Sequence, residues 1–414
     1  MKITDMQVFP MGSAWRTLIY IRLVTDSGLT GIGEASLTNR EEGVLGYLEG
    51  VKRKHVLGSD PFNIEDLWMR MWRNEFWRGG VMATTAMSAV EIACWDIVGK
   101  SAGLPVYKLL GGRCHGKIKA YANGWYTVER KPRELARRVK AVLAKGYHAF
   151  KIDPFGPGSY ELDRKQKILS IDIIAALRDA VWPDVEIMVE MHGRFSAATA
   201  AGLARELAPY RPAWLEEPVP PDNYDELKRV VDLIGGAVPV AAGERCYTRH
   251  GARDLLERGA IDVAQFDVTH CGGIMELKKM AAMADTRYVL VAPHNSQGPV
   301  CTAASVHAGF TITNLKCQEV FDDFADPHVR DAVKGFPPVV DGYILPPEKP
   351  GLGVDLDEAV IRANPMRQVF FNLWSDDWHM REAGGKIAKS VPARRRTSKR
   401  RRAGKGAGGH HGKA

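Results

Sequence analysis

The sequence predicts an α/β fold, a parallel (β/α) barrel preceded by a second, α+β domain. Short apolar runs alternate with longer helical patterns over most of the chain, which is typical of parallel strands joined by helices. Acidic residues end successive apolar runs at regular intervals: 26 residues separate Glu190 from Glu216, and 28 separate Glu216 from Glu244. Each interval fits one strand, one helix and two loops. The three carboxylates are therefore expected at the carboxyl ends of neighbouring strands, where such barrels keep their active sites.

The elements of the barrel follow from hydrophobic periodicity. Each expected strand is a short apolar run that stops at a charged residue or a His. The expected strands are residues 149–152, 185–189, 213–215, 238–242, 263–266, 288–292 and 312–318. The helices expected between them include residues 132–145, 166–180, 197–207, 224–233 and 274–284.

The residues before the barrel have a different pattern. Residues 17–25 and 30–34 flank an Asp-Ser-Gly turn and predict a β-hairpin. A helix is expected over residues 84–99, and the Pro- and Gly-rich residues 342–355 indicate a return to the first domain. The expected division is a capping domain at residues 1–115, the barrel at 116–335, a C-terminal segment returning to the cap at 336–385, and a basic tail at 386–414.

Composition agrees with an intracellular protein of two domains. A length of 414 residues exceeds one typical core. No apolar run reaches the ~20 residues that cross a bilayer, and no signal peptide opens the chain, so no membrane partner is expected. Six cysteines without a Cys-x-x-Cys pair favour reduced thiols and a cytoplasmic location.

The net charge of +8 is concentrated at the C-terminus. Residues 386–414 contain 11 Lys or Arg and no acidic residue, so the rest of the chain carries about −3, which is +8 less 11. A segment of this composition has little to bury and is expected to be disordered. We interpret it as a solvated extension, with weak binding of nucleic acid as the alternative.

Five motifs in a fixed order resemble those of a known group. They are residues 88–97 (SAVEIACWDI) with Gly111-Gly112, residues 214–218 (WLEEP), residues 243–245 (GER), Asp267 six residues before Gly273, and residues 293–295 (PHN). Over about residues 1–360 the chain resembles the enolase superfamily, in its mandelate racemase and muconate lactonizing enzyme branch. Residues 190–194 (EMHGR) look like the motif of acid-sugar dehydratases of the D-galactonate dehydratase type. The resemblance implies a modified (β/α)7β TIM-like barrel under an α+β capping domain, a sugar-acid substrate and a homo-oligomer.

The carboxylate series predicts a metal site. Removing a proton α to a carboxylate builds a second negative charge on the substrate, which a bound cation must stabilise. Glu190, Glu216 and Glu244 suit a hard divalent cation and leave it positions for substrate and water. The expected cofactor is Mg²⁺, with Mn²⁺ as the alternative. The resembling enzymes usually carry Asp as the first ligand, and the longer Glu190 departs from that pattern.

Two His residues are the candidate acid and base. An imidazole can accept a proton near neutral pH, so His294 is the candidate base. Asp267, 27 residues upstream, is expected to orient it, as in the His-Asp dyad of the resembling family. The resemblance gives Glu319 a hydrogen bond to the distal carboxylate oxygen of the substrate. It gives His192 the role of the acid that protonates the departing hydroxide.

The second expected strand departs from the family. Where the family often has Lys-x-Lys, this chain has Lys151-Ile152-Asp153, so a two-base racemase arrangement looks incomplete. Lys151 and Asp153 are expected either to hold substrate hydroxyls or to form a salt bridge. Arg16 and Asn39 lie in loops that the resemblance places over the barrel mouth, and they are candidate substrate contacts.

The favoured function is Mg²⁺-dependent dehydration of a sugar acid, an aldonate or aldarate. The 3-hydroxyl would be eliminated and a 2-keto-3-deoxy acid formed. A cycloisomerase or an epimerase/racemase of a sugar acid would use the same site without releasing water. A non-catalytic nucleic-acid-binding protein is the third alternative, and it rests on the tail alone.

Overall fold

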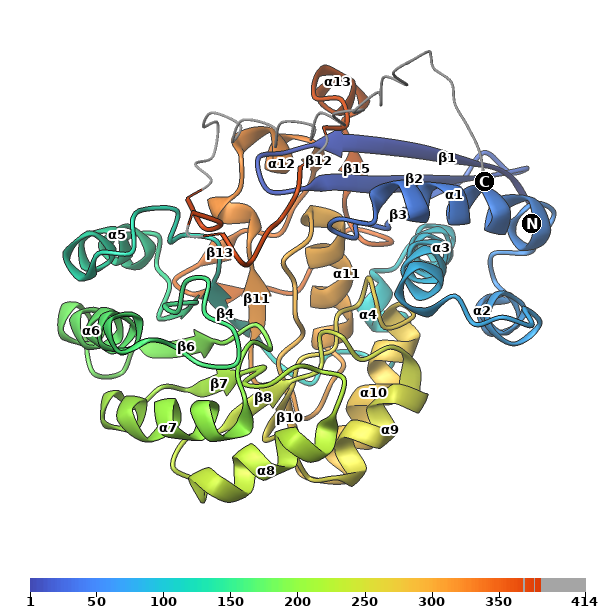
Figure 1. The fold of residues 1–414 in the computed structure, drawn as a ribbon. Coiled ribbons are helices and arrows are strands. Elements are labelled where there is room, and N and C mark those ends of the chain that lie inside the picture. Colours follow the sequence, from blue (N-terminus) through green and yellow to red (C-terminus); the bar gives the residue numbers. More distant parts are fainter. Residues whose placement is uncertain (368, 376, 381–414) are drawn as a thin grey trace, which may run out of the picture.

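The computed structural model describes residues 1–367, 369–375 and 377–380. Strands and helices alternate around a barrel, and the N-terminal sheet and helices, in blue, lie against one side of it (Figure 1). The predicted fold class is therefore confirmed. The basic tail predicted at residues 386–414 lies outside the described residues.

Eight strands form the barrel, and neighbours pair in parallel from β4 to β10. β11 pairs in parallel with β4. The barrel closes between β10 and β11, because Lys316 N, just before β11, donates to Val291 O of β10 at 2.7 Å. The strands are β4 (Ile118–Ala122), β5 (Ala149–Ile152), β6 (Glu186–Glu190), β7 (Trp214–Glu216), β8 (Val240–Ala242), β9 (Val263–Ala264), β10 (Leu290–Val291) and β11 (Gln318–Val320).

One helix follows each strand from β4 to β10, on the outside of the barrel. The five helices expected from the sequence are present within a few residues of their predicted bounds. The helices are α5 (Pro132–Ala144), α6 (Arg164–Ala180), α7 (Ala197–Leu207), α8 (Tyr224–Ile234), α9 (Thr248–Glu257), α10 (Ile274–Asp285) and α11 (Pro299–Gly309), with the 3-10 turn η2 (Ala208–Tyr210) after α7.

The strand expected at residues 312–318 is wrong over most of its length. Turns continue from α11, with Ile312 N bonded to Gly309 O at 3.2 Å, and β11 begins only at Gln318. Ile312 and Thr313 favour strands by propensity, but the packing around the end of α11 overrides that preference. Glu319 consequently lies inside β11 rather than after it.

One inward-facing side chain from each strand or its flank fills the barrel below the candidate site. Tyr121 and Trp214, the two largest, meet edge to face with ring centroids 5.6 Å apart. Side chains two residues apart on a strand face the same way. The residues two positions after this layer therefore also point into the barrel and form the next layer. The lower layer is Tyr121, Ala149, Met188, Trp214, Ala241, Val263, Ala292 and Cys317. Two residues further along are Asn123, Lys151, Glu190, Glu216, Gln265, His294 and Glu319.

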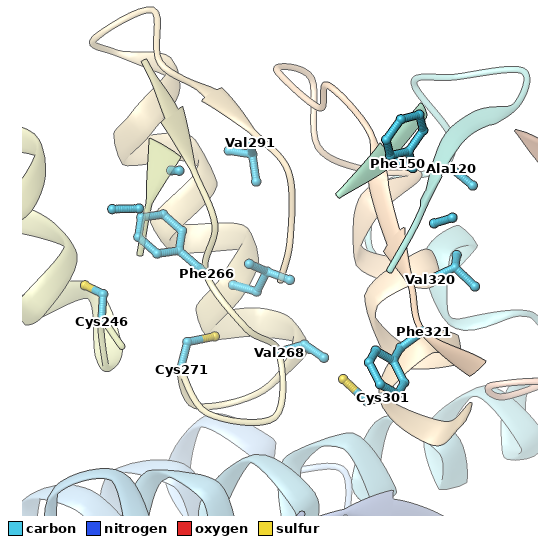
Figure 2. Packing of buried hydrophobic residues seen from close by; sticks show 14 of the residues in the cluster. Ala120, Phe150, Cys246, Phe266, Val268, Cys271, Val291, Cys301, Val320 and Phe321 are labelled. Atoms are coloured by element: carbon cyan, nitrogen blue, oxygen red, sulfur yellow. The ribbon is translucent and has the colours of Figure 1, made fainter. Parts of the chain in front are cut away.

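The outer face of the strands is packed as well. A larger apolar cluster lies between the strands and their helices. Figure 2 shows Val291 of β10 beside Phe266, which follows β9, and on the opposite side Phe150 of β5 and Val320 of β11, with cap helices passing below both. The strands that carry the candidate site are therefore covered on both faces, as parallel strands generally are.

The cap is an antiparallel three-stranded sheet with helices packed on it. Pairing of β2 with β3 confirms the predicted hairpin. Among the described residues, α3 is the one helix long and apolar enough to span a membrane, and 78% of its most apolar window is buried inside the protein. The elements are β1 (Ile3–Gly12), β2 (Thr17–Thr25), β3 (Thr30–Glu34), α1 (Glu41–Val51), the π turn η1 (Lys52–Val56), α2 (Ile64–Arg73), α3 (Gly80–Ala102) and α4 (Val106–Leu109).

Two buried carboxyl groups of the cap cover the N-termini of barrel helices. Glu91 of α3 accepts hydrogen bonds from the first two N–H groups of α10, at 2.8 and 2.9 Å. Glu34 of β3 accepts from Gly298 N and Cys301 N, at the start of α11, at 2.7 and 2.9 Å. Helix N-termini leave N–H groups without partners inside the helix. The cap is thereby attached at the two helices that flank His294.

Gly273 explains one of the sequence motifs. It is the N-cap of α10 with a φ of 102°, which favours glycine, and a Cβ there would collide with the Glu91 carboxyl group. Burial raises the pKa of Glu91 to about 8. The close approach of α3 to α10 therefore depends on a glycine at this position.

The chain returns from the barrel to the cap after β11. β14 pairs with β13 and with β4 in antiparallel fashion. Leu352 N then donates to Asp96 Oδ1 in α3 at 2.8 Å, and Gly12 N donates to Asn364 O at 2.9 Å. The elements are η3 (Asp322–Phe324), α12 (Pro327–Asp331), β12 (Val333–Lys334), β13 (Val339–Val340), β14 (Tyr343–Ile344), β15 (Asp355–Leu356) and α13 (Glu358–Ala363).

Replacing Glu91 tests the attachment of the cap. Glu91→Ala leaves N–H groups of α10 and the Trp95 indole N–H without their acceptor. We expect the free energy of unfolding to fall by about 3 kcal/mol or more, because buried unsatisfied donors are costly. Urea denaturation measures it. The exposed Glu42 gives the control, since Glu42→Ala should change stability by no more than about 0.5 kcal/mol. Equal stability of the two variants would contradict this role.

Candidate active site

The three carboxylates predicted to bind a metal meet at one end of the barrel. Glu190 ends β6 and Glu216 ends β7, and the strand register sets them opposite each other. Glu244 follows β8 by two residues. One ligand oxygen from each lies within 4.8 Å of the others, and no other group of three potential ligands this close was found in the described part of the chain.

Lys151, at the third position of β5, lies among these carboxylates. Its Nζ is 3.3 Å from Glu190 Oε2 and 3.0 Å from Glu319 Oε1, and it also pairs with Glu216. Burial alone would lower the pKa of Lys151, but the surrounding carboxylates raise it well above its usual value. The side chain therefore remains an ammonium ion. Of the two interpretations left open for it, the structure shows the salt bridge.

The charges at the site favour a cation. Burial and the neighbouring Glu216 raise the pKa of Glu190 well above its usual value. Burial also acts to raise the pKa of Glu216, but the Lys151 ammonium outweighs it and lowers that pKa to about 2. The three carboxylates of the triad and Glu319 thus face a single ammonium ion from Lys151. A hard divalent cation fits a donor set of three convergent carboxylates with this excess of negative charge.

His294 lies against Glu244 and is paired with Asp267. Its Nδ1 is 2.7 Å from Asp267 Oδ2, and its Nε2 is 3.2 Å from Glu244 Oε2. Burial lowers the pKa of His294, but Glu244, Glu319 and Asp267 together outweigh it and raise the pKa to about 10. Asp267 Oδ1 accepts hydrogen bonds from Thr269, which fixes the carboxylate behind the imidazole.

His192 lies against Glu190, a different carboxylate of the triad. Its backbone N–H donates to Glu190 Oε1 at 2.7 Å, and its φ of 48° is unusual for a residue other than glycine. Its Nδ1 is 2.5 Å from Asp153 Oδ2. Asp153 also pairs with Arg194. Burial lowers the pKa of His192 to about 4.

Glu319 is fully buried and has no free oxygen. Lys151 and Asn123 approach its Oε1 at 3.0 and 2.7 Å, and Asn295 N donates to its Oε2 at 2.8 Å. Asn123 was not among the site residues predicted from the sequence. The signal for it was its place two residues after the inward-facing Tyr121, in line with Lys151 and Glu190.

The two cap residues predicted to contact substrate lie around the same mouth. The Arg16 guanidinium donates to the backbone and side-chain oxygens of Ser296, which lies two residues after His294. Asn39 Nδ2 donates to Phe371 O at 2.8 Å, and Phe371 N donates to Asn39 Oδ1 at 2.9 Å. Asn39 therefore fixes a C-terminal segment beside the site.

That C-terminal segment brings an aromatic side chain that sequence reasoning missed. The Trp378 ring is 5.4 Å from the His192 ring at an interplanar angle of 90°. Phe371 packs on Trp378 with ring centroids 5.6 Å apart. Nothing in the local sequence around Trp378 indicates this contact, because 186 residues separate the two side chains.

Two family models cover most of the chain. Residues 6–111 match the mandelate racemase / muconate lactonizing enzyme N-terminal domain, and residues 134–360 match the enolase C-terminal domain-like model. The chain belongs to the mandelate racemase/muconate lactonizing enzyme family of the enolase superfamily. This confirms the resemblance inferred from its motifs.

Relatives within this family carry the names of sugar-acid dehydratases. The chain is 36% identical over 376 residues to D-galactonate dehydratase of Ralstonia pickettii, covering 87% of this chain and 94% of the relative. It is 34% identical over 370 residues to D-gluconate/D-galactonate dehydratase of Picrophilus torridus, covering 87% and 93%. A crystal structure of a mandelate racemase/muconate lactonizing enzyme-like protein from Roseovarius sp. TM1035 superposes with a TM-score of 0.83 at 35% identity, covering 89% of this chain and 96% of that one.

Replacing Lys151 tests the charge balance of the site. Lys151→Met leaves buried carboxylates without their counter-charge, which typically costs about 3–5 kcal/mol. We expect this loss in the free energy of unfolding measured in EDTA, and a smaller loss in Mg²⁺, because a bound cation supplies positive charge. Lys228, in an exposed pair with Asp232, gives the control, and Lys228→Met should cost about 0.5 kcal/mol or less. An equal loss in EDTA and in Mg²⁺ would contradict the expectation.

Proposed function

We propose that the protein is a Mg²⁺-dependent hydro-lyase that converts a sugar acid, an aldonate or aldarate, into its 2-keto-3-deoxy acid. The observation that carries the proposal is the placement of two histidines beside one carboxylate triad. His294 Nε2 is 3.2 Å from Glu244 Oε2, and the backbone N–H of His192 donates to Glu190 Oε1 at 2.7 Å. The names of the relatives in Ralstonia pickettii and Picrophilus torridus support the substrate class.

Glu190, Glu216 and Glu244 would hold Mg²⁺, with Mn²⁺ as the alternative. When bound, the cation supplies the charge stabilisation that a substrate carboxylate needs once its α-proton is removed. The protein contributes a water-poor site, because Glu190 and Glu216 are buried and the Glu244 side chain is 18% exposed.

His294 is the proposed base for the C2 proton. Asp267 on Nδ1 leaves Nε2 as the nitrogen that faces the triad. With a pKa of about 10, His294 is an imidazolium paired with Glu244, so it can act as a base only when Glu244 is engaged elsewhere, as a metal ligand would be. We propose that Glu319 borders the distal carboxylate oxygen of the substrate and keeps Lys151 in place.

His192 is the proposed acid for the departing hydroxide. Burial lowers its pKa to about 4 and favours the neutral ring, whereas an acid must carry two ring protons. The Asp153 carboxylate at 2.5 Å from Nδ1 acts in the opposite direction, since an anion at this distance stabilises imidazolium. The acid role therefore depends on Asp153.

The alternative of a racemase or epimerase needs a second base. Lys151 is held as an ammonium ion by three carboxylates, and Asp153 stands where a family lysine base is expected. A cycloisomerase would keep the triad and His294 and release no water. Binding of nucleic acid would reside in residues 386–414, and deleting them tests it.

Other features of the proposal concern the whole chain. D-galactonate and D-gluconate are the first substrates to test, with Arg16 and Asn39 bordering the substrate from the cap. We propose the same domain division as from the sequence: a cap (1–115), a barrel (116–335), a returning segment (336–385) and a tail (386–414). We propose a homo-oligomer, which size-exclusion chromatography with light scattering tests. The six free cysteines are compatible with a cytoplasmic location.

Activity should depend on the triad and on a divalent cation. We expect purified protein with Mg²⁺ to form keto acid from at least one C4 to C6 sugar acid, detected as the semicarbazone, and EDTA to abolish this. Glu216→Gln should lose ~10²-fold or more in kcat, since one electrostatic stabiliser is removed. Full activity in EDTA would exclude the proposed metal.

The two imidazoles should be separable by isotope exchange. His192→Asn retains the base and the triad, so exchange of the substrate C2 hydrogen in D₂O should continue while formation of keto acid falls. His294→Asn should lose both reactions. Proton NMR measures exchange in recovered substrate. Dehydration at the wild-type rate in His192→Asn would place the acid elsewhere, and a wild type that yields only an epimer would overturn the assignment.

A further inference from the structure

Both carboxylate oxygens of Asp153 accept hydrogen bonds from protein groups. The carboxylate is fully buried. Its Oδ1 accepts from Phe155 N at 2.9 Å, and its Oδ2 accepts from His192 Nδ1 at 2.5 Å and from Arg194. A carboxylate bound in this way has little capacity left for a substrate hydroxyl. The contact that connects it to the candidate chemistry is the one to His192.

Arg194 anchors this carboxylate. Its guanidinium is buried and also donates to Gly156 O and, at 3.1 Å, to Met191 O. These carbonyl groups belong to the loops that follow β5 and β6, so the ion pair with Asp153 is held from both loops. A buried charge retained in such a network is fixed in position.

The remaining contacts of His192 restrict its ring in other directions. The left-handed φ of 48° projects the side chain from a strained backbone, and the backbone N–H is tied to Glu190. The edge-to-face contact with Trp378 limits rotation of the imidazole. With Nδ1 on Asp153, the nitrogen left to face the site is Nε2, and 22% of the side chain remains exposed.

We propose that Asp153 is a positioning residue for His192: its carboxylate accepts the Nδ1 proton, fixes the orientation of the ring and stabilises the imidazolium, whose Nε2 proton is delivered to the departing hydroxide. The inference rests on the proposed function and replaces the interpretation of Asp153 as a substrate contact. In the step concerned, His294 takes the C2 proton, the C2–H electron pair becomes the C2=C3 bond, and the C3–O bond breaks. The Nε2 proton joins the leaving hydroxide as water, and the enol then becomes the 2-keto acid.

The arrangement gives the site two His-carboxylate pairs with separate duties. Asp267 supports His294, and Asp153 supports His192, through Nδ1 in both cases. Removing the carboxylate of such a pair typically lowers turnover by orders of magnitude, because the ring adopts the wrong tautomer. Only the Asp153 pair is expected to affect elimination while sparing proton abstraction.

Asp153→Asn tests the inference with D-galactonate and D-gluconate in D₂O. We expect formation of keto acid to fall ~10²-fold, while C2 exchange stays within a few-fold of wild type. Persistent exchange also shows that the variant is folded with its base and triad in place. Equal loss of exchange and dehydration would mean a merely structural role and would overturn the proposal.

A matched control and a double variant sharpen the result. Asp96 is another buried carboxylate with a Lys partner and two backbone N–H donors, and Asp96→Asn should leave the ratio of exchange to dehydration unchanged. In a His192→Asn background, Asp153→Asn should cause no further loss of dehydration, since coupled residues are non-additive. Additive losses would overturn the proposal.

A spectroscopic measurement separates this inference from the proposed function. In protein labelled with ¹⁵N-histidine, the His192 signals, assigned by their absence in His192→Asn, should show the proton on Nδ1. Asp153→Asn should shift that tautomer balance and leave the His294 signals unchanged. If no sugar acid is dehydrated but the tautomer shifts, the proposed function fails and the positioning role stands. An unchanged His192 tautomer in Asp153→Asn would overturn the positioning role.

Discussion

The candidate site depends on one buried ammonium ion shared among buried carboxylates. Lys151 contacts Glu190, Glu216 and Glu319, and carboxylates withdrawn from water lose hydration and repel one another. Without the ammonium charge the upper layer of the barrel would be hard to fold in the absence of metal. With it, an excess of negative charge remains, because Glu190, Glu216, Glu244 and Glu319 share this one ammonium ion. The same arrangement thus lets the protein fold and leaves it able to attract a divalent cation.

Much of the barrel could be predicted, because its geometry repeats along the chain. A regular interval between strand ends requires only that each strand and helix occupy similar lengths, and the inward layers follow from the period of two in a strand. Short strands are harder: β9 and β10 have two residues each, which is too few for periodicity to define. The run at residues 312–318 has strand-forming side chains, yet the end of α11 holds its first residues in turns. That outcome is set by tertiary packing, which no local pattern contains.

The sequence predicted which residues belong to the candidate site better than it predicted the contacts that they make. Spacing and motif placed Glu190, Glu216, Glu244, Asp267 and His294 together. The partners of Lys151 and Asp153 could not be chosen from sequence, because an ammonium or carboxylate group at a strand end suits a substrate or an ion pair equally well. Arg194 stands inside a quoted motif, but its burial against Asp153 depends on how two loops meet. Trp378 reaches His192 only because the chain returns past the cap, where Asn39 fixes Phe371.

The asymmetry of the two imidazoles bears on which reaction the site can support. Both rings have an aspartate on Nδ1, yet their surroundings push their pKa values apart. At His294 the neighbouring carboxylates outweigh burial and raise the pKa to about 10. At His192 burial dominates and lowers the pKa to about 4. Interconversion of enantiomers requires two groups able to exchange the same proton from opposite faces, so similar proton affinities would serve it better. Elimination requires instead that one group take a proton from carbon and a different group give one to oxygen. The two imidazoles lie in unlike environments, and Lys151, which contacts the triad, is held as an ammonium ion and is not free to act as a second base. The site is therefore arranged for elimination, in which the two proton transfers belong to different groups.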